Sequence, residues 1–262
     1  MSIKIQFSKY QGAGNDFILI DNRNGHFDRN NEELIKKLCD RRFGIGGDGL
    51  MLLQNTKNFD FEMVYYNADG AEGTMCGNGG RCIVAFARDL NIISEKTDFL
   101  AVDGPHDAEI AAYQVNLGMI DVNQIHRDRE AYVMNTGSPH YILKVNDLAN
   151  LDVFKEGYAI RNNEIYGEKG INVNFIEPEE NGYFVRTFER GVEDETFACG
   201  TGATAAAMAM AIDQSLEGDL RIPIRVLGGQ LYISFHKSGN TFTNVYLKGP
   251  ANFVFKGEIE IG

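Results

Sequence analysis

The sequence predicts an α/β protein of two similar lobes, each a curved, mainly antiparallel sheet around a central helix. The first observation behind this is a pair of matching stretches, residues 75–90 (MCGNGGRCIVAFARDL) and 197–212 (FACGTGATAAAMAMAI). Each stretch places a cysteine and a glycine loop directly before an apolar run. Because the glycines allow close backbone approach and the run is typical of a helix, we expect Cys76 and Cys199 at helix N-termini.

The second observation is that the match extends far beyond these two stretches. Cys76 and Cys199 are 123 positions apart, and the same offset relates other landmarks in the two halves. These are Gly14-Asn15 with Gly137-Ser138, Gly47 with Gly170, Gly77 with Gly200, Gly79 with Gly202, and Asn67 with Arg190. A single register indicates an internal duplication of units of about 120 residues, well above the period of a solenoid repeat. We expect the boundary between the lobes near residues 115–124.

The third observation is that the runs after the cysteines, residues 82–87 and 203–212, are apolar on nearly every side. A helix that is apolar all round is buried, so strands should surround each of them. A pseudo-twofold between the lobes would bring both helix N-termini to one cleft, and clefts between domains are favoured ligand sites.

The other elements follow in chain order. Residues 3–21 predict a strand, a glycine turn and a strand, and residues 31–42 a helix capped by Asn30 or Asn31. Further strands are expected before residue 54, over residues 60–66 and over residues 98–125. The second lobe repeats the plan, with strands in residues 132–145, a short helix near residues 148–161, and strands at residues 171–176, 183–189, 222–226, 230–236 and 241–247.

Composition narrows the class of protein. The chain has 262 residues, of which 44% are apolar and 24% charged, as in soluble globular proteins. No apolar stretch reaches the roughly 18 residues that span a bilayer, and the N-terminus alternates like a strand, without a signal-peptide core. A net charge of −12 argues against nucleic acid and anionic membranes as partners. Four cysteines without a CxxC pair favour a reducing cytoplasm.

Two of the four cysteines are expected to be structural. Cys39 lies in the apolar set of its helix, and Cys82 lies inside a helix, with Ala205 at its duplicate position. The duplication retains Cys76 and Cys199, which can act as a pair. One thiolate removes a proton from a carbon and the other thiol delivers a proton to the opposite face, so the centre is inverted without a cofactor or metal. Backbone N–H groups of Gly77-Asn78 and Gly200-Thr201 can bind an α-carboxylate.

Polar residues near the glycine loops remain open to two interpretations. His140 and Glu189 have Phe17 and Tyr66 at their duplicate positions, so they are polar additions of the second lobe. They either bias the protonation of the cysteines or are a turn histidine and an exposed strand-end glutamate. For the pair at positions 15 and 16, Asn-Asp turn chemistry is the simpler interpretation.

Five segments together resemble the diaminopimelate epimerase family, in order and over nearly the whole chain. They are KYQGAGNDF, NADGAEGTMCGNGGRC, GSPH, NVNF and ERGVEDETFACGTGA. The resemblance implies the diaminopimelate epimerase-like fold and a cofactor-independent epimerase that interconverts LL- and meso-2,6-diaminopimelate in lysine biosynthesis. It also implies a homodimer, and a C-terminal strand that returns to the first lobe. The lobes are then residues 1–117 with 252–262, carrying Cys76, and residues 118–251, carrying Cys199.

The resemblance also implies the residues of the site. Cys76 and Cys199 match the catalytic cysteines, and His140 and Glu189 match residues that tune them. The matching substrate-binding positions are Asn15, Asn67, Gly77, Asn78, Asn172, Glu189, Arg190, Gly200 and Thr201. The guanidinium of Arg190 suits the distal carboxylate of a diacid, and the asparagines offer donors and acceptors for its distal ammonium and carboxylate groups.

The chain departs from the family pattern at two positions. Gly49 stands where the family often has glutamine, and Ser138 where it has asparagine. Both departures affect substrate contacts rather than the thiol pair. We retain Ser138 as a substrate-binding candidate and leave Gly49 out of the site.

Two alternative functions were weighed. A two-thiol racemase of the proline racemase kind would act on a monocarboxylate, which leaves Arg190 and the asparagines without an evident purpose. A thiol redox or metal-binding module would pair Cys76 with Cys82. Zinc sites need more ligands at tight Cys or His spacing, and residues six apart on a helix point to different sides.

Overall fold

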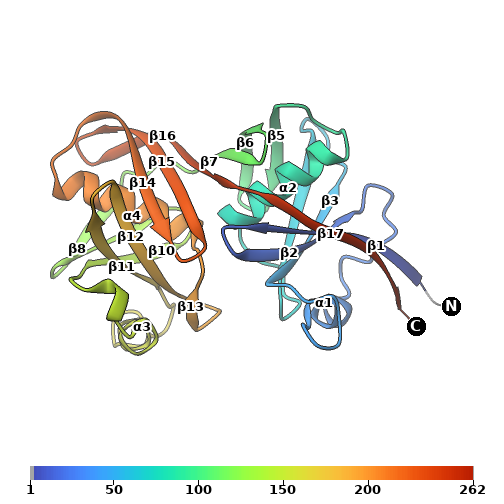
Figure 1. The fold of residues 1–262 in the computed structure, drawn as a ribbon, viewed down its shortest axis with the longest axis horizontal. Coiled ribbons are helices and arrows are strands. Elements are labelled where there is room, and N and C mark those ends of the chain that lie inside the picture. The colour runs from blue at the N-terminus through green and yellow to red at the C-terminus, as the bar shows by residue number, and fades with distance from the viewer. Residues whose placement is uncertain (1–2, 262) are drawn as a thin grey trace. The chain divides into compact units, whose positions relative to one another are not determined.

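The computed structural model describes residues 3–261, which form two compact units. The first contains the residues up to Leu117 together with those from Pro250 onward, and the second runs from Gly118 to Gly249. Strands predominate in both units, and each holds a few helices (Figure 1). The predicted α/β fold class is confirmed.

The first unit is a sheet with two helical crossovers. Its sheet order is β17-β1-β2-β3-β4-β5-β6-β7, parallel only between β2 and β3 and between β4 and β5. Parallel neighbours need a crossover connection, and α1 and α2 supply the two. The elements are β1 (Ile3–Gly12), β2 (Asn15–Asp21), α1 (Glu32–Cys39), β3 (Gly49–Gln54), β4 (Phe61–Asn67), α2 (Gly77–Asp89), β5 (Lys96–Ala101), β6 (Gly104–Ala111), β7 (Gln114–Gly118) and β17 (Asn252–Ile261).

The second unit repeats this topology. Its order is β8-β9-β10-β11-β12-β14-β15-β16, again parallel at two steps, β10–β11 across α3 and β12–β14 across α4. β13 adds to β12. The elements are β8 (Ile125–Asp128), β9 (Ala131–Asn135), β10 (Pro139–Lys144), the 3₁₀ turn η1 (Leu148–Asn150), α3 (Val153–Arg161), β11 (Asn172–Glu179), β12 (Gly182–Glu189), β13 (Asp194–Thr196), α4 (Gly200–Asp213), β14 (Gly218–Val226), β15 (Gly229–Ser238) and β16 (Thr241–Pro250).

The first parallel step of each unit has the same register. Phe17 of β2 lies opposite Gly49 of β3, and His140 of β10 lies opposite Asn172 of β11. Each residue of the second pair is 123 positions after its counterpart in the first pair. The offset read from the sequence is therefore also the offset of the backbone pairing.

Each cysteine of the matching stretches is the N-cap of a buried helix, as predicted. Cys76 caps α2 and Cys199 caps α4, both with extended backbone angles (φ −113° and −114°). α2 is buried from Gly77 through Ala87, and α4 from Gly200 through Ala211. Strands of the same unit pack against each helix: β1 to β4, β6 and β17 contact α2, and β9 to β12, β14 and β15 contact α4.

The outer helices cover the other face of each sheet. α1, capped by Asn31, packs Ile35 and Leu38 into the first core, where Cys39 is also buried. The short helix predicted near residues 148–161 is present as α3 but begins only at Val153, and the separate 3₁₀ turn η1 precedes it. Asp152 divides them because its side chain accepts from the Lys155 amide and begins a new helix.

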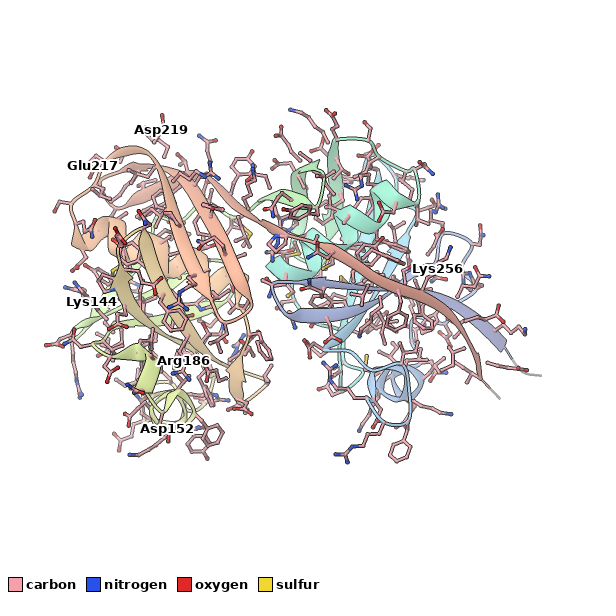
Figure 2. The ribbon with its side chains drawn as sticks, in the orientation of Figure 1. Lys144, Asp152, Arg186, Glu217, Asp219 and Lys256 are labelled. Atoms are coloured by element: carbon pink, nitrogen blue, oxygen red, sulfur yellow. The ribbon has the colours of Figure 1, made fainter. Side chains whose placement is uncertain are left out.

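Hydrogen bonds and an ion pair fix short connecting segments within each unit. Arg186 of β12, labelled in Figure 2, pairs with Glu195 of β13 at 2.6 Å and donates to the carbonyls of Leu148 and Leu151. In the first unit, the Ala251 amide donates to the carbonyl of Tyr113 (2.8 Å). No helix in residues 3–261 is both long and apolar enough to cross a bilayer.

Candidate active site

In the first unit, Cys76 lies beside the amide of Asn15. Its sulfur is 3.9 Å from Asn15 Oδ1, which also accepts from Asn78 Nδ2 at 3.3 Å. Asn15 Nδ2 donates to the carboxylate of Asp48, which orients the amide, because a carboxylate only accepts. The structure thus brings together three predicted site residues, and the partner facing the Cys76 thiol is a hydrogen-bond acceptor.

A cluster of ion pairs holds Asp48, the residue that orients the Asn15 amide. Asp16 pairs with Lys9 at 2.7 Å and with Arg41 at 2.6 Å, and Arg41 also binds Asp48. Burial raises the pKa of Asp16, but the hydrogen bonds from Arg41 and Lys9 outweigh it and bring the pKa to about 2. The residues after the first glycine turn are therefore part of a charged scaffold, beyond the turn chemistry expected for them.

Arg81 fixes the glycine loop that follows Cys76. This side chain is fully buried on α2. It donates to the Gly77 carbonyl (3.1 Å), to Asn78 Oδ1 (3.0 Å) and to the Pro250 carbonyl (3.3 Å). Because the arginine occupies Oδ1 of Asn78, the amide of Asn78 presents its Nδ2 to Asn15.

Asn67 is placed apart from this cluster. It ends β4, two strands from Asn15 in the sheet, and its side chain is exposed. Its backbone bonds to Ala71 and Gly70 form the turn that follows the strand.

In the second unit, Cys199 lies beside a hydroxyl instead of an amide. Its sulfur is 3.4 Å from Thr201 Oγ1, and that oxygen is 2.9 Å from His140 Nε2. The carbonyl of Thr201 accepts from Thr136 Oγ1 at 2.8 Å, which holds the first turn of α4 against the end of β9. The structure therefore brings His140, Thr201 and Cys199 together, as three predicted site residues.

His140 is neutral in the folded protein. It is fully buried on β10, and burial, followed by the positive charge of Arg190, lowers its pKa to about 3. The structure therefore excludes one of the two interpretations left open for His140, that of a turn histidine.

Three further predicted residues lie around the end of β12. Asn172 Oδ1 accepts from the Arg190 amide at 2.8 Å, and Arg190 donates its guanidinium to the Lys169 carbonyl (3.1 Å). Glu189 accepts from the Thr196 hydroxyl at 3.0 Å and is partly exposed.

The predicted site residue Ser138 lies directly before β10, where its carbonyl accepts from the Thr136 amide.

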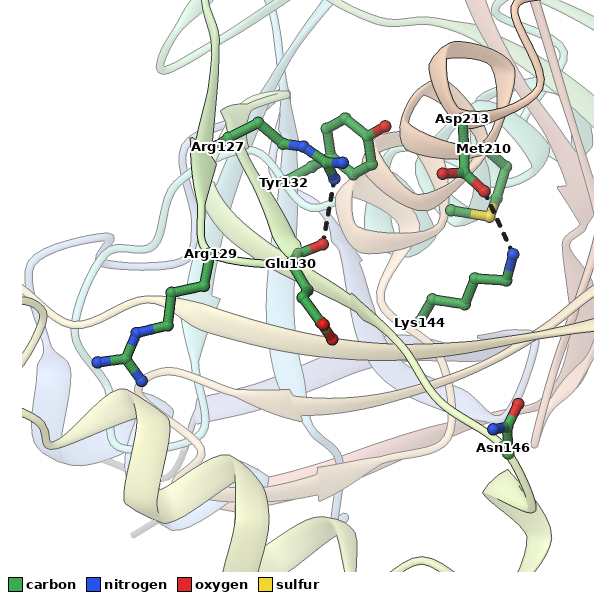
Figure 3. Close-up of a pocket in the computed structure, with 8 residues that line it drawn as sticks. All are labelled: Arg127, Arg129, Glu130, Tyr132, Lys144, Asn146, Met210 and Asp213. Carbon is green, nitrogen blue, oxygen red and sulfur yellow. Dashed lines mark hydrogen bonds and ion pairs between the residues drawn. The ribbon is translucent and has the colours of Figure 1, made fainter.

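A separate pocket of about 400 Å³ opens at the other end of α4 (Figure 3). Lys144 and Asp213 form an ion pair at 3.2 Å within it. The lining residues are Arg127, Arg129, Glu130, Tyr132, Lys144, Asn146, Met210 and Asp213. None belongs to the predicted site, and Met210 lies ten residues beyond Gly200, about 15 Å along the helix. Within residues 3–261, no cluster of three or more His, Cys, Asp or Glu side chains is arranged to hold a metal ion.

Sequence comparison assigns the chain to a family. The family model described as diaminopimelate epimerase matches residues 7–117 and 132–254. The chain belongs to the diaminopimelate epimerase family. The diaminopimelate epimerase of Flavobacterium psychrophilum is 52% identical over 253 residues, covering 96% of this chain and 98% of that protein. That of Chlorobaculum tepidum is 42% identical, with coverages of 95% and 99%.

Solved structures support the fold of this diaminopimelate epimerase family member. A phenazine biosynthesis PhzF family protein of Bacillus anthracis superimposes with a TM-score of 0.77 at 14% identity, covering 99% of this chain and 100% of that chain. A hydroxyproline epimerase of Agrobacterium vitis gives 0.73 at 11% identity, with coverages of 98% and 91%. Family membership confirms that the chain is an enzyme, an isomerase of the epimerase type.

The structure explains one departure from the family pattern. A Cβ at Gly49 would lie 2.5 Å from the Tyr66 carbonyl oxygen and 2.6 Å from Tyr65 Cε2. A glutamine side chain at this position of β3 therefore does not fit, because β4 and the ring of Tyr65 already fill the space.

Sequence reasoning missed several residues of this site. Asn174 and Thr187 contact one another behind His140, and Arg81 and Asp48 orient the amides around Cys76. One signal was available for Asn174. It lies two residues after Asn172 on a strand, so both face the same side, and its duplicate position is the apolar Met51.

Proposed function

We propose that the enzyme interconverts LL- and meso-2,6-diaminopimelate by moving a proton at the α-carbon between two cysteines. The observation that carries this proposal is that Cys76 and Cys199 begin two equivalent buried helices, one in each unit. The relatives' names supply the substrate.

In the proposed reaction, one cysteine acts as a thiolate and removes the α-proton. The other acts as a thiol and gives a proton to the opposite face of the same carbon, so one C–H bond breaks and another forms. The first cysteine ends as a thiol and the second as a thiolate, which balances protons without an oxidant or a cofactor. Helix N-termini suit the α-carboxylate because the N–H groups of the first turn lack partners within the helix. Gly77, Asn78, Gly200 and Thr201 supply these groups.

The remaining candidates would bind the rest of the substrate. Arg190 carries the positive charge for a carboxylate, and Glu189 the negative charge for an ammonium group. Asn15 and Asn172 begin their strands, Ser138 precedes β10 and Asn67 ends β4, and these side chains offer mixed donors and acceptors. His140 would act on Cys199 through Thr201, without touching the substrate.

The proposed substrate also suggests a pathway and a compartment for the enzyme. We infer a role in lysine biosynthesis, in the cytoplasm, without nucleic acid as a partner. We also propose a homodimer, supported by Phe253 and Phe255, which lie on the same face of β17 and are each about half exposed.

Proton exchange at the α-carbon tests the reaction and the substrate together. LL-diaminopimelate in D2O is followed by NMR with wild-type enzyme, Cys76→Ser, Cys199→Ser and, as the control, Cys82→Ser. We expect deuterium to enter with inversion in wild type and Cys82→Ser, and epimerisation to be lost in the other two variants. Exchange that survives Cys76→Ser and Cys199→Ser contradicts the two-thiol reaction. Exchange with L-proline or trans-4-hydroxy-L-proline alone contradicts the substrate.

A further inference from the structure

A chain of buried polar side chains leads to the sulfur of Cys199, and it lies entirely within the second unit. Thr187 of β12 donates to Asn174 Oδ1 of β11 (2.9 Å), and Asn174 Nδ2 is 3.0 Å from His140 Nδ1 of β10. His140 Nε2 is 2.9 Å from Thr201 Oγ1, which is 3.4 Å from Cys199 Sγ. We call Thr187, Asn174, His140 and Thr201 the polar chain. All four residues are buried.

The direction of every hydrogen bond in the polar chain follows from one backbone group. The carbonyl of Tyr141 lies 3.2 Å from Asn174 Nδ2, and a carbonyl only accepts, so this atom is the amide nitrogen. Its other hydrogen points to His140 Nδ1, which must therefore be unprotonated. Because His140 is neutral, its single proton is on Nε2 and is donated to Thr201 Oγ1.

The Thr201 hydroxyl then directs its own hydrogen to the sulfur of Cys199. Its oxygen already accepts from His140, so a second donation from a Cys199 thiol would leave the hydroxyl hydrogen unsatisfied. Among the described residues, no buried side-chain nitrogen or oxygen lacks a hydrogen-bond partner. A donor facing a sulfur stabilises the thiolate form of that cysteine.

The first unit has no equivalent of the polar chain. The duplicate positions of His140 and Asn174 are Phe17 and Met51, both fully buried and apolar. The sulfur of Cys76 instead faces Asn15 Oδ1, which is an acceptor and so favours the thiol form. Asn15 Oδ1 beside Cys76 is therefore an acceptor, whereas the Thr201 hydroxyl beside Cys199 is a donor.

We propose that Asn174 is a positioning residue, which sets the tautomer of His140 so that the Thr201 hydroxyl donates to Cys199. In the free enzyme, Cys199 is then the thiolate and Cys76 the thiol, and Cys199 removes the first proton. This rests on the proposed two-thiol reaction. Among the charged groups on the surrounding elements, Glu189 accepts from the Thr196 hydroxyl, Arg186 pairs with Glu195, and the positive charge of Arg190 acts on His140.

The test is the rate of alkylation by iodoacetamide as a function of pH, measured for each cysteine by peptide mass spectrometry on free enzyme. In wild type we expect Cys199 to titrate at lower pH than Cys76. In Asn174→Leu the midpoint of Cys199 should rise by about 1–2 pH units, because a hydrogen bond to a charged group contributes about 1.5–3 kcal/mol. In Asn174→Asp it should rise as well, since the new carboxylate accepts the Nδ1 proton and selects the other tautomer. The midpoint of Cys76 should not move in either variant.

Met51→Leu, at the duplicate position beside the other helix, is the matched control and should leave both midpoints unchanged. If Asn174→Leu unfolds the protein, Cys39 and Cys82 become labelled too, and Thr187→Val carries the test with a smaller rise in the same direction. An unchanged Cys199 midpoint in a folded variant overturns the proposal. The readout needs no substrate, so wild-type exchange in D2O separates a failure of the polar chain from a failure of the proposed function.

Discussion

Gly202 and Asn174 are in such close contact that a Cβ at Gly202 would lie 2.2 Å from Asn174 Oδ1. The glycine belongs to the first turn of α4 and the asparagine to β11. Gly202 is therefore required because a side chain there would collide with the polar chain, and not only because glycine gives the loop backbone freedom.

Gly202→Ala should lower the free energy of unfolding by about 1–3 kcal/mol, because the methyl group displaces Asn174 from Thr187 and His140. The matched control is Gly79→Ala, at the duplicate position, where the new methyl would meet the flexible side chain of Met51 at 3.2 Å. Both changes bring the same helix-propensity gain, so their difference reports the contact. Urea denaturation measures it, and equal stabilities would contradict the prediction.

Stability should fall with acid because of His140. Its pKa is about 3 in the folded protein and 6.5 when unperturbed, so the unfolded chain takes up a proton first as the pH falls. The stability held above pH 6.5 is then lost between that pH and about 3, at up to about 1.4 kcal/mol per pH unit. His140→Gln should flatten this slope, whatever its effect on absolute stability. The exposed His126→Gln serves as the control, and parallel slopes in wild type and His140→Gln would refute the assignment.

Replacement of Arg81 should destabilise the first unit. Arg81→Met removes three hydrogen bonds and leaves acceptors on Gly77, Asn78 and Pro250 without this donor, the first two of them buried, at an expected loss of about 2–4 kcal/mol. The exposed Arg42→Met should change stability by less than about 0.5 kcal/mol. Denaturation curves of the two variants compare these values, and a near-neutral Arg81→Met would show that water replaces the guanidinium.

Cys39 and Cys82 should resist alkylation in the native enzyme. Burial raises the pKa of each of these thiols to about 12, so almost no thiolate is present at pH 8. We expect native labelling at Cys76, whose side chain is partly exposed, and at Cys199, the proposed thiolate, and labelling of all four cysteines in urea. Native labelling of Cys82 would mean that α2 opens readily.

The elements that sequence reasoning predicted best are those with a local signal. The apolar runs after Cys76 and Cys199 are helices with cysteine N-caps, and the 123-residue offset reappears in the strand pairing of Phe17 and His140. The helix expected near residues 148–161 was predicted to begin too early, because an apolar pattern does not show that Asp152 is the N-cap.

Periodicity, glycine loops and a repeated motif are present in the chain itself, so they are enough to predict the fold class, the family and the candidate thiol pair. How the surroundings of the two thiols differ depends on the folded structure. The Tyr141 carbonyl on a neighbouring strand orients the amide of Asn174. Asp48, which follows α1 in the sequence, orients the amide of Asn15, which precedes it. Hydrogen-bond direction depends on which groups the folded sheet brings within about 3 Å, and no local pattern carries that information.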